Sequence, residues 1–133
     1  MQPKHFATAL ENLIQQQESY PAEAFHFLKE ALDFTVDKDD KRDPASRSKH
    51  VSASDLLIGF HDLALQEFGP MAATLLSEWG ITSCSDVGDM VFLLIEEGMF
   101  GKQDSDDRED FAEIYNFDDA FVQPFLPKRS VSA

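Results

Sequence analysis

Apolar residues recur at helical spacing through most of the chain, and glycine or proline interrupts each run. Leucines and phenylalanines fall every three or four positions between residues 52 and 68. Gly69 ends this run and Pro70 opens the next, while Gly98 closes a later run over residues 87–95. Short amphipathic segments of this kind bury their apolar stripes against one another. The pattern therefore predicts a mainly α fold.

Five helices are expected from this periodicity. They cover residues 3–17, 21 to about 36, 52–68, 71–79 and 83–97. Ser52 with Asp55, and Ser83 with Asp86, fit capping boxes at two of the starts. Gly59 lies inside the third helix, where glycine costs about 1 kcal/mol relative to alanine. We expect close packing against a neighbouring helix to be the reason for it.

The segment after Gly98 fits two structures. Residues 99–117 are compatible with a β-hairpin or with a helix, and residues 117–126 with a helical turn closed by prolines. Helix, helix, turn, helix and hairpin is the order of a winged helix. We therefore expect helices three to five to be winged-helix-like, with a short C-terminal β-hairpin. The alternative is an all-α bundle.

A chain of 133 residues favours one domain, which we place at residues 1–127. Residues 37–50 contain no large apolar residue and are dense in charge, which predicts an exposed charged loop. Residues 128–133 are expected to form a flexible tail. The first residues lack the apolar region of a signal peptide, and the longest apolar run, residues 90–95, is too short to span a bilayer. These features predict a cytoplasmic protein.

The charge distribution argues against DNA as a ligand. The net charge is −14, and residues 51–127 hold sixteen acidic residues against two basic ones. A recognition helix needs lysine or arginine for phosphate contacts, and the fifth helix has neither. The segment in the place of the wing, residues 104–110, is almost entirely acidic. The expected topology thus carries the wrong electrostatics for DNA.

Two charged segments are candidate interaction sites. The first is an acidic cluster formed by Asp104, Asp106, Asp107, Glu109 and Asp110. It does not fit an EF-hand loop, because position 5 would be an arginine and position 6 a glutamate. The second lies in the basic stretch 38–50, where four residues could contact nucleic acid: Lys41, Arg42, Arg47 and Lys49.

No catalytic or cofactor motif is present. The four histidines (His5, His26, His50 and His61) show no zinc-ligand spacing, and we expect neither a metal nor a cofactor. His61 and Asp62 are neighbours about 100° apart on a helix, so they are not expected to form a dyad by themselves. An enzyme site around His61, Asp62 and Glu67 is an alternative.

The single cysteine, Cys84, cannot form an intrachain disulfide. It is expected to be buried as a small apolar residue, or to sit without a chemical role at a helix N-terminus. A nucleophilic role with a distant histidine is the alternative.

Three stretches carry a family resemblance. QEFGPMAATLLSEWGI, SDVGDMVFLLIEEGMFGK and REDFAEIYNFDDAF with PFLP resemble a family of conserved hypothetical proteins from planctomycetes and verrucomicrobia. The resemblance extends over nearly the whole chain, including YPAEAFHFLKEALDFTV. It implies a bacterial, intracellular protein, and it implies no activity, cofactor or site residue.

These observations lead to a functional hypothesis. We predict a non-enzymatic protein–protein interaction module whose unidentified partner is basic, or which self-associates. A nucleic-acid-associated regulator using residues 38–50, and an enzyme without a recognisable motif, are the alternatives.

Overall fold

The structure is a computed structural model that describes residues 3–17, 19–42, 52–97 and 114–126. The helices are α1 (Pro3–Gln16), α2 (Ala22–Arg42), α3 (Ala53–Phe68), α4 (Ala72–Glu78) and α5 (Cys84–Glu96). The short turns are η1 (Gly69–Met71), the π-helical η3 (Asp118–Val122) and η4 (Gln123–Phe125). These parts of the chain contain no strand, and the expectation of a mainly α fold with five helices is confirmed. Most of the hairpin predicted at residues 99–117 lies outside the described residues.

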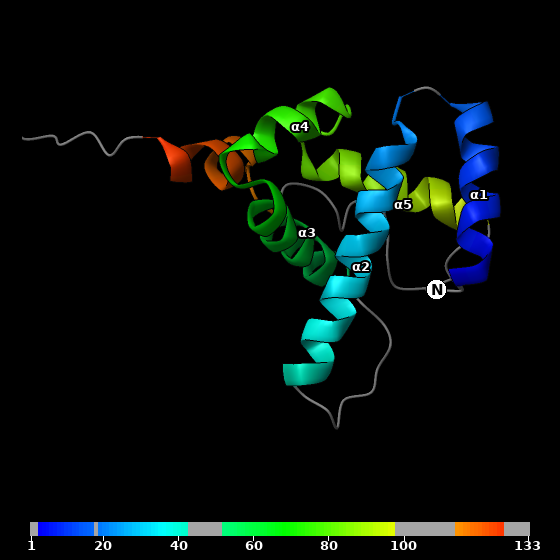
Figure 1. Ribbon diagram of the computed structural model, residues 1–133, viewed down its shortest axis with the longest axis horizontal. Helices are drawn as coiled ribbons and strands as arrows, with labels where there is room; N and C mark the ends of the chain where they lie inside the picture. Colours follow the sequence, from blue (N-terminus) through cyan, green and yellow to red (C-terminus); the bar gives the residue numbers. More distant parts are fainter. Residues whose placement is uncertain (1–2, 18, 43–51, 98–113, 127–133) are drawn as a thin grey trace, which may run out of the picture.

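The helices pack around α2 and α3, which share the most extensive contact between described elements (Figure 1). α1 packs against α2 and α5, and α5 also packs against α3. The C-terminal segment (residues 114–126) contacts α3 and α4 through η3. α3 therefore contacts both α2 and the C-terminal segment.

Serine caps begin α3 and α5, as the sequence predicts. Ser52 Oγ accepts a hydrogen bond from the Asp55 amide at 3.1 Å, and Ser83 Oγ accepts one from the Asp86 amide at 3.3 Å. The Asp86 carboxylate also accepts a bond from the Thr82 amide at 2.9 Å. Each cap satisfies a backbone donor that the first helical turn leaves without a partner.

The predicted end of the second helix is wrong, because α2 continues through Arg42 and takes in the first part of the expected loop 37–50. Apolar periodicity stops at Val36, but backbone hydrogen bonding does not require apolar side chains. The first strong helix breaker after Val36 is Pro44, and a proline also disfavours helical geometry in the residue before it. The remainder of the expected loop, residues 43–50, lies outside the described residues.

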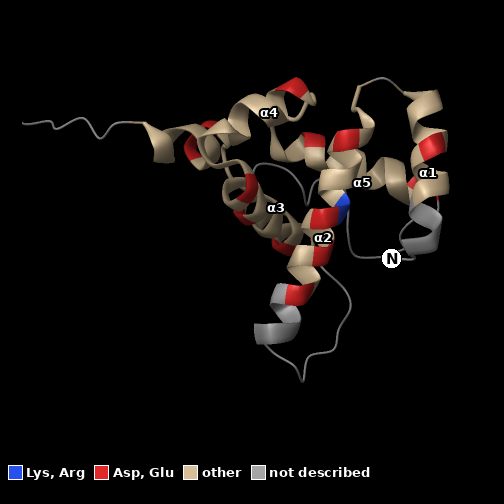
Figure 2. Cartoon of the chain, in the orientation of Figure 1, with Lys and Arg blue, Asp and Glu red and all other residues tan. Residues whose placement is uncertain are grey.

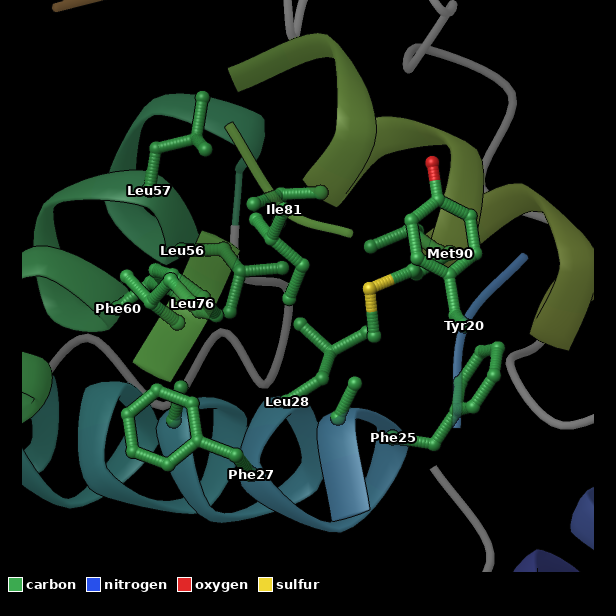
Figure 3. Packing of buried hydrophobic residues seen from close by; sticks show 14 of the residues in the cluster. Tyr20, Phe25, Phe27, Leu28, Leu56, Leu57, Phe60, Leu76, Ile81 and Met90 are labelled. Atoms are coloured by element: carbon green, nitrogen blue, oxygen red, sulfur yellow. The ribbon is translucent and has the colours of Figure 1, made fainter. Parts of the chain in front are cut away.

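One apolar cluster joins all five helices and the C-terminal segment. Figure 3 shows part of it, with Phe25, Phe27 and Leu28 of α2 facing side chains of α3, α4 and α5. The Phe27 ring lies 5.1 Å from the Phe60 ring in an edge-on arrangement, a favoured geometry for aromatic pairs. Phe121 of η3 completes the cluster and is 1% exposed.

Gly59 permits the closest approach between α2 and α3. A Cβ atom placed on Gly59 would lie 3.0 Å from Thr35 Cβ and still nearer to Thr35 Oγ1. Thr35 is buried, and its hydroxyl donates to the Ala31 carbonyl at 2.7 Å. The close packing expected for this glycine is thus present. Among the described helices, none has the length and apolar character required to cross a membrane.

Candidate functional site

The structure describes few of the predicted interaction residues. The acidic cluster Asp104, Asp106, Asp107, Glu109 and Asp110 lies outside the described residues, as do Arg47 and Lys49. Lys41 and Arg42 belong to the last turn of α2. These two candidate sites therefore stay predictions.

His61 connects α3 to the C-terminal segment. Its Nε2 atom lies 3.1 Å from the Ala120 carbonyl oxygen, and its Nδ1 atom lies 3.1 Å from Asp62 Oδ1. The expectation that His61 and Asp62 do not pair by themselves is wrong, because the Asp62 side chain turns back onto the neighbouring ring. Glu67 is exposed on the same helix and has no hydrogen bond to His61. The proposed trio is therefore not assembled.

Tyr115 and Cys84 make the second connection between the C-terminal segment and the helices. The Tyr115 hydroxyl donates to the Leu57 carbonyl at 2.8 Å, and the Cys84 thiol donates to the Tyr115 carbonyl at 3.3 Å. Burial, followed by the nearby Cys84 and Asp62, raises the pKa of Tyr115 above its usual range. The phenol therefore remains a neutral donor. Cys84 is fully buried in the first turn of α5, which confirms its expected burial.

Aromatic rings surround these polar contacts. The His61 ring lies 5.5 Å from Tyr115 and 5.2 Å from Phe121, and Phe117 lies 4.8 Å from Phe121. Phe125, by contrast, is 41% exposed. The sequence showed aromatic residues in this segment but did not show which of them enters the core. These polar and aromatic contacts hold the C-terminal segment against α3 and α5.

A second polar cluster links the start of α2 to α5. The Tyr20 hydroxyl lies 3.1 Å from Asp86 Oδ1 and 3.4 Å from Asp89 Oδ2. Burial, followed by the charges of Asp86 and Asp89, raises the pKa of Tyr20 above its usual range. The phenol is thus a donor between two carboxylates. Sequence reasoning missed this cluster because its members lie 66 and 69 positions apart.

The most extended chemical feature of the described residues is an acidic surface. Fifteen acidic side chains are described, and Lys29 is the single described lysine or arginine side chain (Figure 2). The acidic residues are Glu11, Glu23, Glu30, Asp33, Asp37, Asp55, Asp62, Glu67, Glu78, Asp86, Asp89, Glu96, Glu97, Asp118 and Asp119. Lys29 is itself paired with Asp33 at 2.9 Å. Figure 2 shows the acidic residues spread over all five helices.

Four acidic residues form a stripe along α2. Glu23, Glu30, Asp33 and Asp37 are all exposed and are separated by seven, three and four positions, which places them on one helical face. The stripe is about 21 Å long at 1.5 Å per residue. The last turns of α2 extend beyond the other helices in Figure 1. This face is therefore open to a partner.

Metal binding finds no support within the described residues, where no three or more histidine, cysteine, aspartate or glutamate residues are grouped to hold an ion. Comparison with known proteins gives no assignment. No family model, no curated protein and no solved structure matches the chain.

Proposed function

We propose that this protein is a non-enzymatic interaction module whose acidic surface binds a basic protein. The observation that supports it most directly is the row of exposed acidic side chains on one face of α2, Glu23, Glu30, Asp33 and Asp37, in a chain of net charge −14. Such a surface attracts and orients a positively charged partner during encounter. The exposed stripe on α2 is the proposed contact face, because its carboxylates share one helical side.

The same charge disfavours the alternatives. Phosphate groups would be repelled by the acidic surface, since nucleic-acid binding depends on neutralisation by lysine and arginine. Self-association through this surface would bring like charges together. An enzyme receives no support from the trio His61, Asp62 and Glu67, because Glu67 stands apart from His61.

The order α3, α4 and α5 is that of the helical part of a winged helix. We propose that helices α3 to α5 are winged-helix-like, with a surface charge unsuited to DNA. A cytoplasmic location and a bacterial source stay predictions from the sequence.

The test is an affinity purification of the tagged chain from nuclease-treated lysate of its own host, read by mass spectrometry. The variant Glu23→Gln/Glu30→Gln/Asp37→Asn removes three charges from the α2 stripe. The control Glu11→Gln/Glu78→Gln/Glu96→Gln removes three exposed charges from α1, α4 and α5. The net charge of the two variants is equal.

We expect one dominant basic protein to be recovered with the wild type and the control, and to be lost with the α2 variant. Loss of the partner with both variants would contradict a defined contact face. Recovery of no protein above background, or recovery dependent on nucleic acid, would overturn the proposed function.

A further inference from the structure

Three aromatic rings meet where α2, the end of α3 and the end of α4 come together. The Phe27 ring lies 5.1 Å from the Phe68 ring and 5.9 Å from the Trp79 ring. The rings of Phe68 and Trp79 are 6.0 Å apart in an edge-on arrangement. Phe27 is 4% exposed, whereas Phe68 and Trp79 are only partly buried. Part of the surface of Phe68 and Trp79 is therefore open to solvent beside a buried ring.

Two exposed carboxylates flank the buried ring along α2. Glu23 lies one turn before Phe27 and Glu30 one turn after it, and residues three or four positions apart are neighbours on a helix. Lys29 pairs with Asp33 at 2.9 Å, and position 29 lies about 200° from position 27 around the helix. The acidic residues of α2 closest to Phe27 are thus Glu23 and Glu30, the first two members of the acidic stripe.

Aromatic surface next to carboxylates favours one kind of cation. A cation above an aromatic ring is attracted by the negative face of the ring. A guanidinium is planar and weakly hydrated, so it can stack on a ring while its N–H groups donate to carboxylates. The ammonium group of lysine is a compact and strongly hydrated charge, and it stacks less well. The combination on this surface therefore fits arginine better than lysine.

We propose that Phe68 and Trp79, together with Glu23 and Glu30, form a docking site for one arginine side chain of a basic protein partner. The guanidinium lies over the open aromatic surface and donates to the α2 carboxylates. This site rests on the proposed function, since it places an anchor at one end of the contact face on α2. It adds a preference for arginine that charge alone does not give, because lysine and arginine carry the same charge.

Trp79 is the one tryptophan of the chain, so its fluorescence reports directly on this site. Capped hexa-arginine and hexa-lysine are suitable probes, because they have equal charge and contain no fluorescent side chain. Calorimetry measures the affinity of each peptide for the full chain, and the emission of Trp79 is recorded over the same concentrations. We expect hexa-arginine to bind about fivefold more tightly than hexa-lysine, the gain typical of one cation–π contact. It should also change the Trp79 emission more.

Two charge variants locate the binding. Glu23→Gln/Glu30→Gln removes the carboxylates beside Phe27, so it should weaken the binding of both peptides and remove the preference for arginine. The control Glu11→Gln/Glu96→Gln removes two exposed charges from α1 and α5 and has the same net charge. This control should keep the preference and the change in emission. A preference that persists after loss of the two α2 carboxylates would contradict the site.

Phe68→Leu tests the aromatic part, because it keeps the charges and the tryptophan but removes one ring. It should bring the affinities of the two peptides together. If this variant weakens the fold, the carboxylate variants still decide, since substitutions at exposed positions usually change stability little.

Equal affinity of the two peptides for the wild type, or an unchanged Trp79 emission at saturation, would overturn the arginine site. Either result would leave the proposed binding of a basic partner standing, as long as the peptides still bind through α2. Failure of both peptides to bind would also overturn the site, and the affinity purification would then decide the proposed function by itself.

Discussion

α3 holds two neighbours by different means. Towards α2 it presents Gly59, where the two backbones approach so closely that the buried Thr35 occupies the place of a side chain. Towards the C-terminal segment it presents the Leu57 carbonyl and the His61 ring, which bond to Tyr115 and Ala120. The α2–α3 contact requires that position 59 has no Cβ atom. The second depends on the presence of a few particular groups.

This difference has consequences for stability. The α2–α3 contact belongs to the centre of the apolar cluster, so its disruption should unfold the helices together. The C-terminal segment is held by one fully buried ring, Phe121, and by cross-element hydrogen bonds. Regions with few contacts can open locally without global unfolding. A larger side chain should therefore destabilise the α2–α3 contact, whereas loss of a side-chain group should destabilise the contact between α3 and the C-terminal segment.

The largest effect is expected for Phe121→Ala. Truncation of a buried phenylalanine costs about 3–5 kcal/mol when the structure cannot relax. Hydrogen exchange should show the loss of protection concentrated in residues 115–123, with α2 and α3 still protected. The control Phe125→Ala removes a ring that is 41% exposed and should change little. Equal loss of protection in every helix would show that the segment is not separable from the core.

Gly59→Ala should destabilise the whole chain by about 1–3 kcal/mol, the usual cost of an overpacked core. The new methyl group would overlap Thr35 Oγ1, so the helices must move apart. Denaturant unfolding measures this change. The double variant Gly59→Ala/Thr35→Ala removes the overlapping hydroxyl and should be less destabilised than the two single changes added together. Strict additivity would contradict the steric explanation.

The sequence predicted the helices well where chemistry is local. Ser52 and Ser83 marked two helix starts because a cap bonds to an amide three residues away. The close packing at Gly59 could be predicted because a glycine destabilises a helix interior, so a compensating contact is expected there. The apolar pattern predicts the wrong end for α2, because apolar periodicity reflects burial. Continuation of a helix depends on the backbone, and the next helix breaker in the sequence is Pro44.

The connections of the C-terminal segment could not be predicted in the same way. His61 reaches Ala120 over 59 positions, and Tyr115 reaches Leu57 over 58. A single sequence does not indicate which of two such distant residues will contact each other. The pairing of His61 with Asp62 was missed for another reason: the angle between adjacent helical positions fixes the Cβ directions but not the rotamers of the side chains.

Tyr115→Phe should have the smallest effect at neutral pH and the clearest effect at high pH. It removes one hydrogen bond to the Leu57 carbonyl, which costs about 1 kcal/mol. Burial raises the pKa of Tyr115 in the folded chain. The neutral phenol is therefore favoured by folding, and this stability is complete below about pH 10, the ordinary tyrosine value, and is lost as the pH rises above it. The variant should lose less stability than the wild type in this alkaline range.

Tyr20→Phe is the matched control, because burial and two aspartates also raise the pKa of Tyr20, yet this ring lies between the start of α2 and α5. Both variants should reduce the alkaline loss of stability measured by denaturant unfolding. Of the two variants, only Tyr115→Phe should lower the hydrogen-exchange protection of residues 115–123, since Tyr115, and not Tyr20, bonds across the contact between α3 and the segment. If Tyr20→Phe released the segment equally, the two polar clusters would act as one unit.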